Sequence, residues 1–476
     1  MTRSGRLLDP AEAPGAVGIT HRVLSTADAL HGLGVRSSDR VLIQGDNSAP
    51  YLVTLLALMR LGTSLVPVDH RQTVPADLEL SARQAGAGWL LTSGAVADLP
   101  GVKTVDYRAL PTTDAGAGAG AARGAGADAQ LDLSEWFARD DAVILWSSGT
   151  TGRPKGVVRS GRAVRGNTLR TIEAMGYGPD DVLAPLLPFS HQYGLSVVLL
   201  WWMAGCTLLV TPYQHIGTAV EQAAEYGATA VDAAPVTYHT LLGVLRRRPA
   251  LRGPLANVRI WGVGGAPLAA PLAREFEETL GRPLLDGYGM TELGNIALAT
   301  PGDPVHCGRP LPGVRVRVVR DGAEAVPGES GHVEVSSPDL MEGYLLPDGT
   351  LDPAPAGEWY ATGDLGLLDA GGRLTVLGRD RAVDRMGFTL YPERLERKAE
   401  ACGRGVKVVA VEDERRGHSL HFVVEDPGGG LPEEWRARIV AHLAEYEWPN
   451  TVHVVREFPT RGPGKVDVAA LRALLG

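Results

Sequence analysis

"AVILWSSGTTGRPKG", residues 142–156, is the stretch on which the interpretation of the whole chain depends. Its apolar start, Ala142 to Leu145, predicts a buried strand that leads directly into glycines and hydroxyl-bearing residues and ends at Lys155. Backbone N–H groups converge on a phosphate only where side chains are small, and hydroxyl groups add donors. Taken alone, the loop is equally compatible with phosphate binding and with a Gly/Ser-rich hairpin turn.

The loop does not have the context of the common nucleotide-binding P-loop. That motif reads GxxxxGK[ST] and runs straight into a helix. Here Lys155 is followed by Gly156-Val157-Val158, which predicts a second strand. The loop therefore connects two strands, and the P-loop interpretation fails.

Strand-like and helix-like patterns alternate through the first three hundred or so residues. A helix over "APYLVTLLALMRLG" follows the first strand, and strands separated by helices predict parallel sheets with crossover connections. From about Val314 the pattern changes to short strands and turns, which predicts an antiparallel or barrel-like region. The strand candidates in the first part are "RVLIQG", "TSLVPV", "GWLLTS", "DAVILWS", "TLLVTP", "TAVDAA" and "VRIWGVGG".

Size and composition exclude several classes of protein. A chain of 476 residues suits two or three core-forming units, and a net charge of -9 argues against a general nucleic-acid binder. The three cysteines lie far apart, so neither a zinc site nor a disulfide framework is indicated and a cytoplasmic location fits. The most apolar stretch, Ser196 to Val210, is too short for a membrane span and predicts a buried helix, turn and strand.

Composition and pattern set two parts of the chain apart from the rest. Residues 112–130 are rich in Gly and Ala, which predicts a mobile surface loop. The chain after residue 378 resembles a small α+β unit that includes a helix candidate over 432–446. We place a domain boundary at 379–381, which gives an N-terminal domain of residues 1–378 and a C-terminal domain of residues 379–476.

The loop is one of seven segments that resemble, in the same order, the signature motifs of the adenylate-forming superfamily of acyl-CoA synthetases, adenylation domains and luciferases. The resemblance covers nearly the whole chain. It implies an α/β fold: a large N-terminal domain of two parallel-rich αβα sheets plus a small β-barrel-like region, then a small mobile α+β lid domain. The other six segments are "PFSHQYG" (188–194), "GVGGAPL" (262–268), "DGYGMTE" (286–292), "GEWYATGDLG" (357–366), "GRDRAVDRMGF" (378–388) and "PTRGPGKVD" (459–467).

The resemblance implies a first reaction that joins a carboxylate to the α-phosphate of ATP and releases pyrophosphate. Thr291 would donate to the α-phosphate, Tyr288 would stack on the adenine, and Asp364 would accept hydrogen bonds from the ribose hydroxyls, or else cap a turn. Arg379 would reach the ribose or phosphate. The implied nucleotide-binding residues are Ser147, Ser148, Gly149, Thr150, Thr151, Gly152, Lys155, Gly264, Gly265, Ala266, Asp286, Gly287, Tyr288, Gly289, Met290, Thr291, Asp364, Arg379 and Lys465.

Two further residues would complete the adenylation chemistry. Glu292 is the implied protein ligand of Mg²⁺, with Thr151 as the weaker candidate; a surface carboxylate is the alternative. Lys465, in "GPGKVD", would bridge the carboxylate and the α-phosphate in the transition state; an exposed tail lysine is the alternative.

The family's C-terminal domain rotates after adenylation and opens a path for the thiol of CoA or of a carrier protein's phosphopantetheine. The segment between Arg379 and Gly387 is one residue short of the family pattern. The hinge acid is therefore Asp380 or, in another alignment, its position is taken by Arg381. Where many relatives carry a glycine pair, this chain has Met386-Gly387. These departures concern the thiol-binding half.

The acid is a small-molecule carboxylic acid whose identity the motifs leave open. His191 is expected beside its carboxylate, or else in the core or at a cap, and Gln192, Gly264 and Gly289 would complete the pocket. Ser190-His191-Gln192 lacks the aspartate of α-amino-acid-activating relatives. Asp232, in the strand pattern "ATAVDAAPV", would meet a substrate amine or hydroxyl, as in a β-amino acid, or pair with an internal backbone donor or arginine.

Other prominent side chains have structural alternatives. Trp201, Trp202 and Trp261 would line a pocket or, more commonly, fill the core. The basic group Arg379, Arg381, Arg385, Arg394, Arg397 and Lys398 would meet CoA phosphates or an acidic carrier protein, or form a solvated face.

Three functions follow from the motifs. The first is an ATP- and Mg²⁺-dependent acid–thiol ligase that acts on CoA or a carrier protein. The second is an amide bond synthetase with an amine acceptor. The third, from another class, is a non-catalytic nucleotide-binding descendant, against which the retention of Lys155, Glu292, Asp364 and Lys465 argues.

Overall fold

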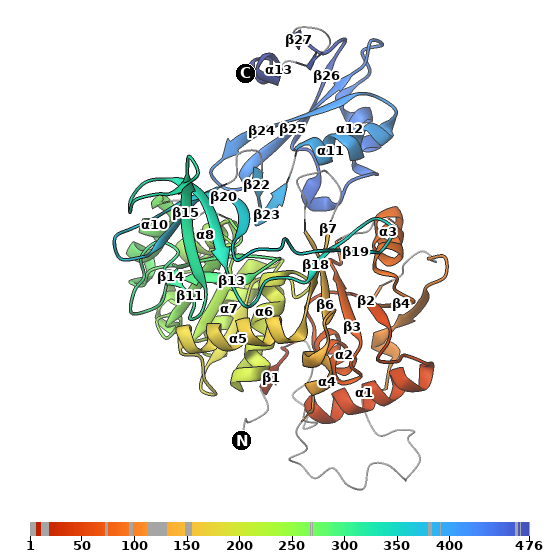
Figure 1. Cartoon of the computed structure of the whole chain (residues 1–476). Coiled ribbons are helices and arrows are strands. Elements are labelled where there is room, and N and C mark those ends of the chain that lie inside the picture. The colour runs from red at the N-terminus through yellow and green to blue at the C-terminus, as the bar shows by residue number, and fades with distance from the viewer. Residues whose placement is uncertain are drawn as a thin grey trace.

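The computed structural model describes residues 6–10, 19–71, 75–94, 99–111, 131–147, 155–266, 268, 270–378, 383–390, 392–461, 465–466 and 468–475. The predicted loop at 112–130 lies outside these residues. In Figure 1 the C-terminal part of the chain, in blue, forms a lobe of its own above the rest of the molecule.

The first large sheet, sheet A, is parallel over most of its width. Parallel pairing runs from β1 to β12, and β13 and β14 add an antiparallel edge. Its strands, in spatial order, are β1 (Arg6–Leu8), β9 (Thr207–Leu209), β8 (Val182–Pro185), β10 (Ala230–Ala233), β11 (Ile260–Gly264), β12 (Leu285–Met290), β13 (Gly294–Leu298) and β14 (Arg309–Pro310).

The second large sheet, sheet B, is built mainly by the first part of the chain. Its parallel half runs from β6 to β5, and β7, β18 and β19 continue it in antiparallel fashion. Its strands, in order, are β19 (Leu351–Pro353), β18 (Gly343–Leu345), β7 (Lys155–Arg159), β6 (Val143–Ser147), β3 (Ser64–Val68), β2 (Arg40–Gln44), β4 (Trp89–Thr92) and β5 (Lys103–Asp106). The two sheets confirm the predicted parallel-rich α/β domain.

Helices lie on both faces of the two sheets. Apolar residues of α1, α2 and α6 share one core with strands of both sheets, while α7, α8 and α10 cover the outer face of sheet A and α3 that of sheet B. The N-terminal helices are α1 (Ile19–Leu33), α2 (Ala49–Arg60), α3 (Pro75–Ala85), α4 (Ser134–Ala138), α5 (Gly161–Met175), α6 (Gln192–Ala204), α7 (Ile216–Glu225), α8 (Pro235–Arg247), α9 (Arg252–Leu255) and α10 (Ala270–Leu280).

Local sequence explains these elements. Strand β3, with the sequence "SLVPV" in the middle of sheet B, is buried on both faces, as expected for a strand covered by crossover helices. Helix α2 starts at Ser48, whose hydroxyl accepts a hydrogen bond from the Tyr51 N–H, and nearly all its residues are buried. Helix α6 ends at Gly205 in the left-handed conformation, and β9 follows, so the predicted helix, turn and strand are confirmed.

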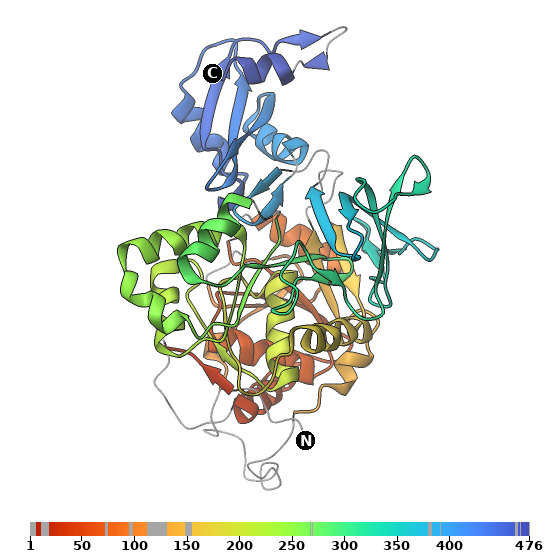
Figure 2. The same cartoon turned by 90° about the vertical axis from the view of Figure 1, so that its left-hand side faces the viewer.

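The region after Val314 forms the expected antiparallel sheet. In Figure 2 its strands, teal to cyan, lie at the right-hand side of the molecule, away from the parallel sheets. Its strands, in order, are β16 (Ala323–Glu324), β15 (Arg315–Arg320), β17 (Gly331–Ser336), β20 (Tyr360–Leu368) and β21 (Leu374–Gly378).

The C-terminal lobe has its own hydrophobic core, which includes buried residues from Val383 to Val452. The predicted helix over 432–446 is too long: α12 ends at Val440, and the Glu447 carboxylate instead accepts the Ala444 N–H at a separate 3₁₀ turn. The elements are β22 (Val383–Arg385), β23 (Phe388–Leu390), α11 (Pro392–Ala399), β24 (Val406–Asp413), β25 (Gly417–Glu425), α12 (Pro432–Val440), β26 (Thr451–Val455), β27 (Thr460–Arg461), β28 (Lys465–Val466) and α13 (Val468–Ala473).

Two hairpins lie at opposite ends of this lobe. Figure 1 shows β22 and β23 at the junction with the N-terminal part, and β27 and α13 at the far end. At the junction, the carbonyl oxygen of Gly387 lies 3.8 Å from the position that a Cβ on Gly265 would take. Among the residues that the structure describes, no helix combines the length and apolarity that crossing a bilayer requires.

Candidate active site

A cavity of about 1330 Å³ lies where the carboxyl ends of the parallel strands face the β22–β23 hairpin. Ligands of open α/β sheets bind at this edge. Asp69 follows β3, Asp232 lies on β10, and Gly264 ends β11, so both large sheets contribute to the wall. From the C-terminal lobe come Met386, Gly387 and Phe388, among others.

The structure brings most of the predicted site residues to this one cavity. Its lining includes Ser147, Lys155, His191, Gln192, Asp232, Gly264, Gly265, Ala266, Asp286, Gly287, Tyr288, Gly289, Met290, Thr291, Glu292 and Asp364. Segments that are more than two hundred residues apart in sequence therefore meet at one surface.

Other predicted residues are not placed at the cavity. Lys465 begins β28, in the hairpin at the far end of the C-terminal lobe (Figure 1). The remaining candidates lie outside the described residues: Ser148, Gly149, Thr150, Thr151, Gly152, Arg379, Asp380 and Arg381.

A cluster at one end of the cavity joins a cation to a carboxylate through a tyrosine. The Nζ of Lys155 lies 4.6 Å from the centroid of the Tyr344 ring, and the Tyr344 hydroxyl donates to Glu292 Oε1 at 2.8 Å. The Tyr344 and Tyr360 hydroxyls are 2.9 Å apart. Glu292 is buried, so it is not the surface carboxylate of the alternative reading.

The chemistry of these donors fits Mg²⁺. Within the described ranges no three His, Cys, Asp or Glu side chains are grouped as a metal site. Mg²⁺ bound with nucleotide needs only one or two carboxylates, because phosphate oxygens and waters complete its shell. Glu292, with Tyr344 hydrogen-bonded to one of its oxygens, is suited to that role.

Two carboxylates lie near Tyr288: Asp286 of the same motif, "DGYGMTE", and Asp364 of the later motif "GEWYATGDLG". The Tyr288 hydroxyl donates to Asp364 Oδ2 at 2.5 Å, which joins β12 to β20. Burial raises the pKa of Asp286 to about 7, although the Cys307 thiol donates to its Oδ2 at 3.3 Å. Sequence reasoning missed Cys307, because nothing near it in the chain matches a site motif.

At another end of the cavity Asp232 is buried with one hydroxyl partner. The Tyr193 hydroxyl donates to Asp232 Oδ1 at 2.9 Å. Of the two alternatives, internal pairing with a backbone donor or an arginine is not found among the described residues, where Tyr193 is the partner. Burial raises the Asp232 pKa to about 6 despite this hydrogen bond. A Cβ on Gly262 would lie 2.3 Å from Asp232 Oδ1, so a larger residue at this position would displace the carboxylate from its present place.

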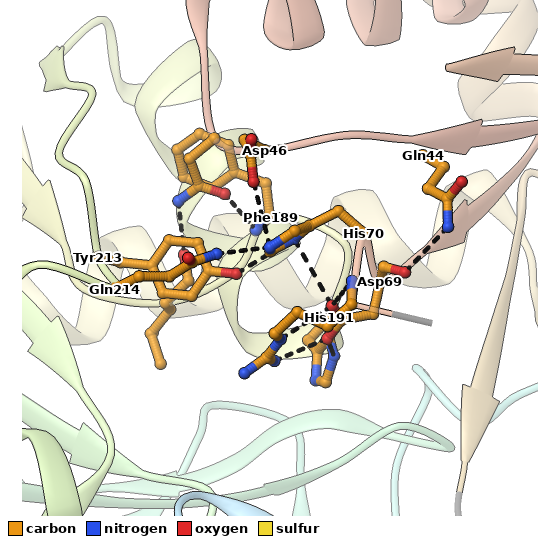
Figure 3. A network of polar contacts seen from close by, with 11 residues as sticks. Gln44, Asp46, Asp69, His70, Phe189, His191, Tyr213 and Gln214 are labelled. Atoms are coloured by element: carbon orange, nitrogen blue, oxygen red, sulfur yellow. Dashed lines mark hydrogen bonds and ion pairs between the residues drawn. The ribbon is translucent and has the colours of Figure 1, made fainter. Parts of the chain in front are cut away.

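His191 belongs to a third polar group, drawn in Figure 3. Its Nε2 lies 2.8 Å from Asp69 Oδ2, and its side chain makes no capping hydrogen bond although it precedes α6. Arg71 donates from its backbone N–H and Nε to Asp69 Oδ1 and from a terminal nitrogen to Oδ2, at 2.7–3.0 Å. Burial alone would raise the Asp69 pKa, but hydrogen bonds and charges from His191 and Arg71 lower it well below its usual range.

A neighbouring histidine connects this group to the rest of the wall. The Nε2 of His70 lies 3.1 Å from Asp46 Oδ1 and also contacts the side-chain amide of Gln214, while the Tyr213 hydroxyl is 3.4 Å from His70 Nδ1 (Figure 3). The site therefore includes residues that motif matching missed. For Asp69 a signal existed, because it directly follows the carboxyl end of a predicted strand.

Two aromatic residues of the C-terminal lobe pack on this group. The Phe388 and Tyr446 rings are stacked, with centroids 4.2 Å apart and planes 8° apart. The Arg71 guanidinium lies 4.7 Å from the Phe388 centroid, and the Phe388 ring meets the His191 ring edge-on at 5.2 Å. No sequence motif indicated these contacts, because the partners come from distant parts of the chain.

Two members of the predicted basic group have structural roles. The Nζ of Lys398 lies 3.0 Å from Asp77 Oδ2, on α3, and 3.0 Å from Glu447 Oε2. Lys398 therefore forms an ion pair between the two lobes. Arg385 is buried and donates to the carbonyl oxygens of Tyr446 and Trp448. Trp201 and Trp261 lie in the core.

Comparison with known proteins agrees with the motifs. Residues 19–345 match the family model described as AMP-binding enzyme. A feruloyl-CoA synthase from an Amycolatopsis species is 29% identical, over 96% of this chain and 93% of that protein. The amide bond synthetase McbA from Marinactinospora thermotolerans superposes with a TM-score of 0.81 at 25% identity, covering 99% and 97% of the two chains. A double mutant of o-succinylbenzoate CoA synthetase from Bacillus subtilis has the same TM-score at 23% identity, covering 99% and 96%.

The family model spans more than half of the chain, and the solved structures share its large α/β domain and smaller C-terminal domain. The chain therefore belongs to the AMP-binding enzyme family, the adenylate-forming superfamily that its motifs indicate.

Proposed function

We propose that this enzyme activates a small-molecule carboxylic acid with ATP and passes the acyl group to the thiol of CoA or of a carrier-protein phosphopantetheine. In the first step a carboxylate oxygen attacks the α-phosphorus, and pyrophosphate leaves. In the second step the thiol sulfur attacks the acyl carbon, and AMP leaves. The observation that carries the proposal is that Lys155, Glu292 and Asp364 line the same cavity as His191.

We assign a set of residues to each chemical group of the nucleotide. Lys155 and the hydroxyl loop from Ser147 to Gly152 hold the β- and γ-phosphates, while Thr291 donates to the α-phosphate. Tyr288 faces the adenine beside Gly264, Gly265 and Ala266, and Asp364 exchanges its Tyr288 partner for ribose hydroxyls. Arg379 reaches the ribose or phosphate from the hinge at Asp380. Glu292 would hold Mg²⁺, which would supply positive charge to the phosphates.

The two hairpins of the C-terminal lobe serve the two steps in turn. With β22–β23 at the cavity, Phe388 and Gly387 line the path that a thiol would take. Adenylation requires the other hairpin, because Lys465 is the ammonium group that bridges carboxylate and α-phosphate in the transition state. We infer that the lobe rotates between the steps and that the structure has the orientation for acyl transfer.

The acid carries a donor group remote from its carboxylate. His191 and Gln192 receive the carboxylate end, and the Asp232–Tyr193 pair receives an amine or hydroxyl at the other, as in a β-amino acid. A substrate ammonium would compensate the buried Asp232 charge, which otherwise costs several kcal/mol.

The first test is ATP–pyrophosphate exchange with separate pools of ferulate-type aryl acids, fatty acids, α-amino acids and β-amino acids. Exchange with one pool, lost at least a hundredfold in Lys465→Ala, is the expected result. Lys103→Ala is the matched control. Lys103 lies on β5, over the ring of Trp89 on β4, and is not part of the cavity lining. Undiminished exchange in Lys465→Ala would refute the assignment of the lysine.

The second test identifies the acceptor. Mass analysis after addition of CoA should show an acyl-CoA. The runner-up function, amide bond synthesis, is favoured by the 25% identity to McbA over nearly the full chain and by the Met386-Gly387 turn. Exchange without acyl-CoA, but with an amide when amines are supplied, would establish it instead.

The third test concerns the acid itself. Asp232→Asn should raise the KM for an amino- or hydroxyl-bearing acid at least tenfold and leave acids without such a group unaffected. Tyr193→Phe, which keeps the carboxylate, should have a smaller effect in the same direction. Unaltered preference in Asp232→Asn would exclude the proposed contact.

A further inference from the structure

Arg71 is held by three groups from two lobes. Its nitrogens donate to both oxygens of Asp69, as a planar fork suits a carboxylate. Its guanidinium carbon lies 4.7 Å from the Phe388 centroid and 5.6 Å from the Tyr446 centroid. The arginine therefore contacts its own lobe through hydrogen bonds and the C-terminal lobe through ring faces.

Asp69 is shared between Arg71 and His191. One oxygen, Oδ2, accepts from the Arg71 fork and also lies 2.8 Å from His191 Nε2. The other oxygen accepts two further hydrogen bonds from Arg71. Any movement of the Arg71 side chain therefore changes the hydrogen-bonding environment of the carboxylate that orients the His191 ring.

The C-terminal lobe closes the same group from the opposite side. The Phe388 ring meets both His191, edge-on, and Arg71, across its face. Arg71 is 18% exposed and Asp69 only 7%, so the pair lies in a water-poor environment. Its attraction is stronger there than at a wet surface, where such pairs contribute little.

We propose that Asp69 and Arg71 are positioning residues that couple the orientation of His191 to the docking of the C-terminal lobe, with Phe388 and Tyr446 as the docking partners. When the C-terminal lobe undocks, Arg71 loses its contacts with Phe388 and Tyr446, and water reaches the pair. Arg71 then holds Asp69 less firmly, and His191 is released from the geometry of the docked state. The docking half of the proposal is independent of the reaction, whereas the His191 half rests on the proposed function.

Docking is tested by a distance measurement that needs no substrate. Spin labels replace two exposed leucines, in Leu33→Cys on α1 and Leu474→Cys near the C-terminus, with Cys402→Ser to remove the half-buried thiol. Double electron–electron resonance should give one main distance in the parent and a broadened or shifted distribution in Arg71→Ala and Phe388→Ala.

The control is a matched arginine inside one lobe. Arg317 forks onto Glu334 and lies 4.4 Å from the Trp359 centroid, so Arg317→Ala removes the same kinds of contact away from the junction. Its distance distribution should equal that of the parent. Distributions in Arg71→Ala and Phe388→Ala that match Arg317→Ala would overturn the docking role.

Coupling to His191 is tested by separating the half-reactions. With the acid that supports exchange, single-turnover transfer to CoA should fall at least tenfold in Arg71→Ala and in Phe388→Ala, a larger loss than either variant shows in pyrophosphate exchange. Phe388→Tyr, which keeps the ring, should restore transfer. Equal losses in both half-reactions, or no loss in transfer, would overturn the coupling. Absence of exchange in the parent enzyme would instead refute the proposed function, and the distance measurement would still decide the docking.

Discussion

Asp69 and Asp232 occupy equivalent places in the two large sheets, but their pKa values are shifted in opposite directions. Each lies at the carboxyl end of a parallel strand, one in each large sheet, and both are buried and line one cavity. Asp69 is surrounded by His191 and Arg71, which lower its pKa. Asp232 has one hydroxyl partner among the residues that the structure describes, and burial raises its pKa to about 6.

The difference separates a carboxylate that organises the protein from one that is suited to a ligand. The charge of Asp69 is compensated within the chain. For Asp232 the described residues provide a neutral hydroxyl and no cation, and a buried charge without an opposite charge destabilises the folded state. Burial by itself therefore does not reveal the role of an acidic residue, whereas the set of its partners does.

The strongest test of this comparison is Asp69→Asn. It should lower the free energy of unfolding by about 3 kcal/mol at pH 7, because Arg71 and His191 lose a charged acceptor. Since the folded pKa of Asp69 is lowered, its contribution is present above the unfolded pKa near 4 and is lost as pH falls through the folded value. Urea titrations should show the difference shrinking below pH 4; a constant difference would contradict this origin.

Asp232→Asn should have the opposite sign. Between pH 3.8 and about 6 the folded carboxyl group keeps a proton that the unfolded one has lost, so wild-type stability falls as pH rises through this window. Asparagine lacks this dependence and keeps an acceptor for Tyr193, so the variant should be more stable by about 2 kcal/mol above pH 6. Denaturant titrations from pH 4 to 8 measure it. A destabilised variant at pH 7 would show that the carboxylate is already compensated.

Arg71→Lys sharpens the comparison by keeping the charge beside Asp69 and removing the fork and the flat face. We expect a loss of about 1.5 kcal/mol, close to one charge-assisted hydrogen bond. The same urea titrations report it, with Arg317→Lys at the Glu334 and Trp359 pair as the control. A loss as large as that of Asp69→Asn would mean that geometry, and not charge, dominates at Asp69.

Tyr193→Phe is expected to have the smallest effect. Its hydroxyl lowers the Asp232 pKa, so its removal should move that pKa above 6 and reduce stability at pH 7 by about 1 kcal/mol. The measurement is the pH at which the stability of the variant stops falling. In the Asp232→Asn background this pH dependence should be absent, and its persistence there would assign it to another group.

The sequence predicted those features that are local in the chain. The alternation of strands and helices was correct for both sheets, because each buried strand is a short apolar run bounded by polar residues or glycine. Glu292 and Asp364, which each lie within a contiguous motif, both line the cavity, while their roles there stay predictions. The helix over 432–446 was overextended, because the pattern did not show that Glu447 caps a separate turn.

Contacts between distant segments could not be predicted in this way. Asp69 and His191 are 122 positions apart, and Arg71 meets aromatic residues of the other lobe. Neither periodicity nor composition specifies which side chains will face each other across a domain junction. Asp232 was noticed because a carboxylate is unusual in an apolar strand, but its hydroxyl partner, Tyr193, could be identified only from the fold.

The long sequence separation between paired strands has a consequence for synthesis on the ribosome. Strand β1, at residues 6–8, pairs with β9, at residues 207–209, whereas sheet B is completed by β18 and β19, at residues 343–353. A nascent chain that has emerged only to residue 200 lacks β9, the partner of β1 in sheet A. It also lacks β18 and β19, the last two strands of sheet B. Both sheets therefore keep open edges until most of the N-terminal domain has been translated, and over that interval the chain depends on slow, non-local pairing.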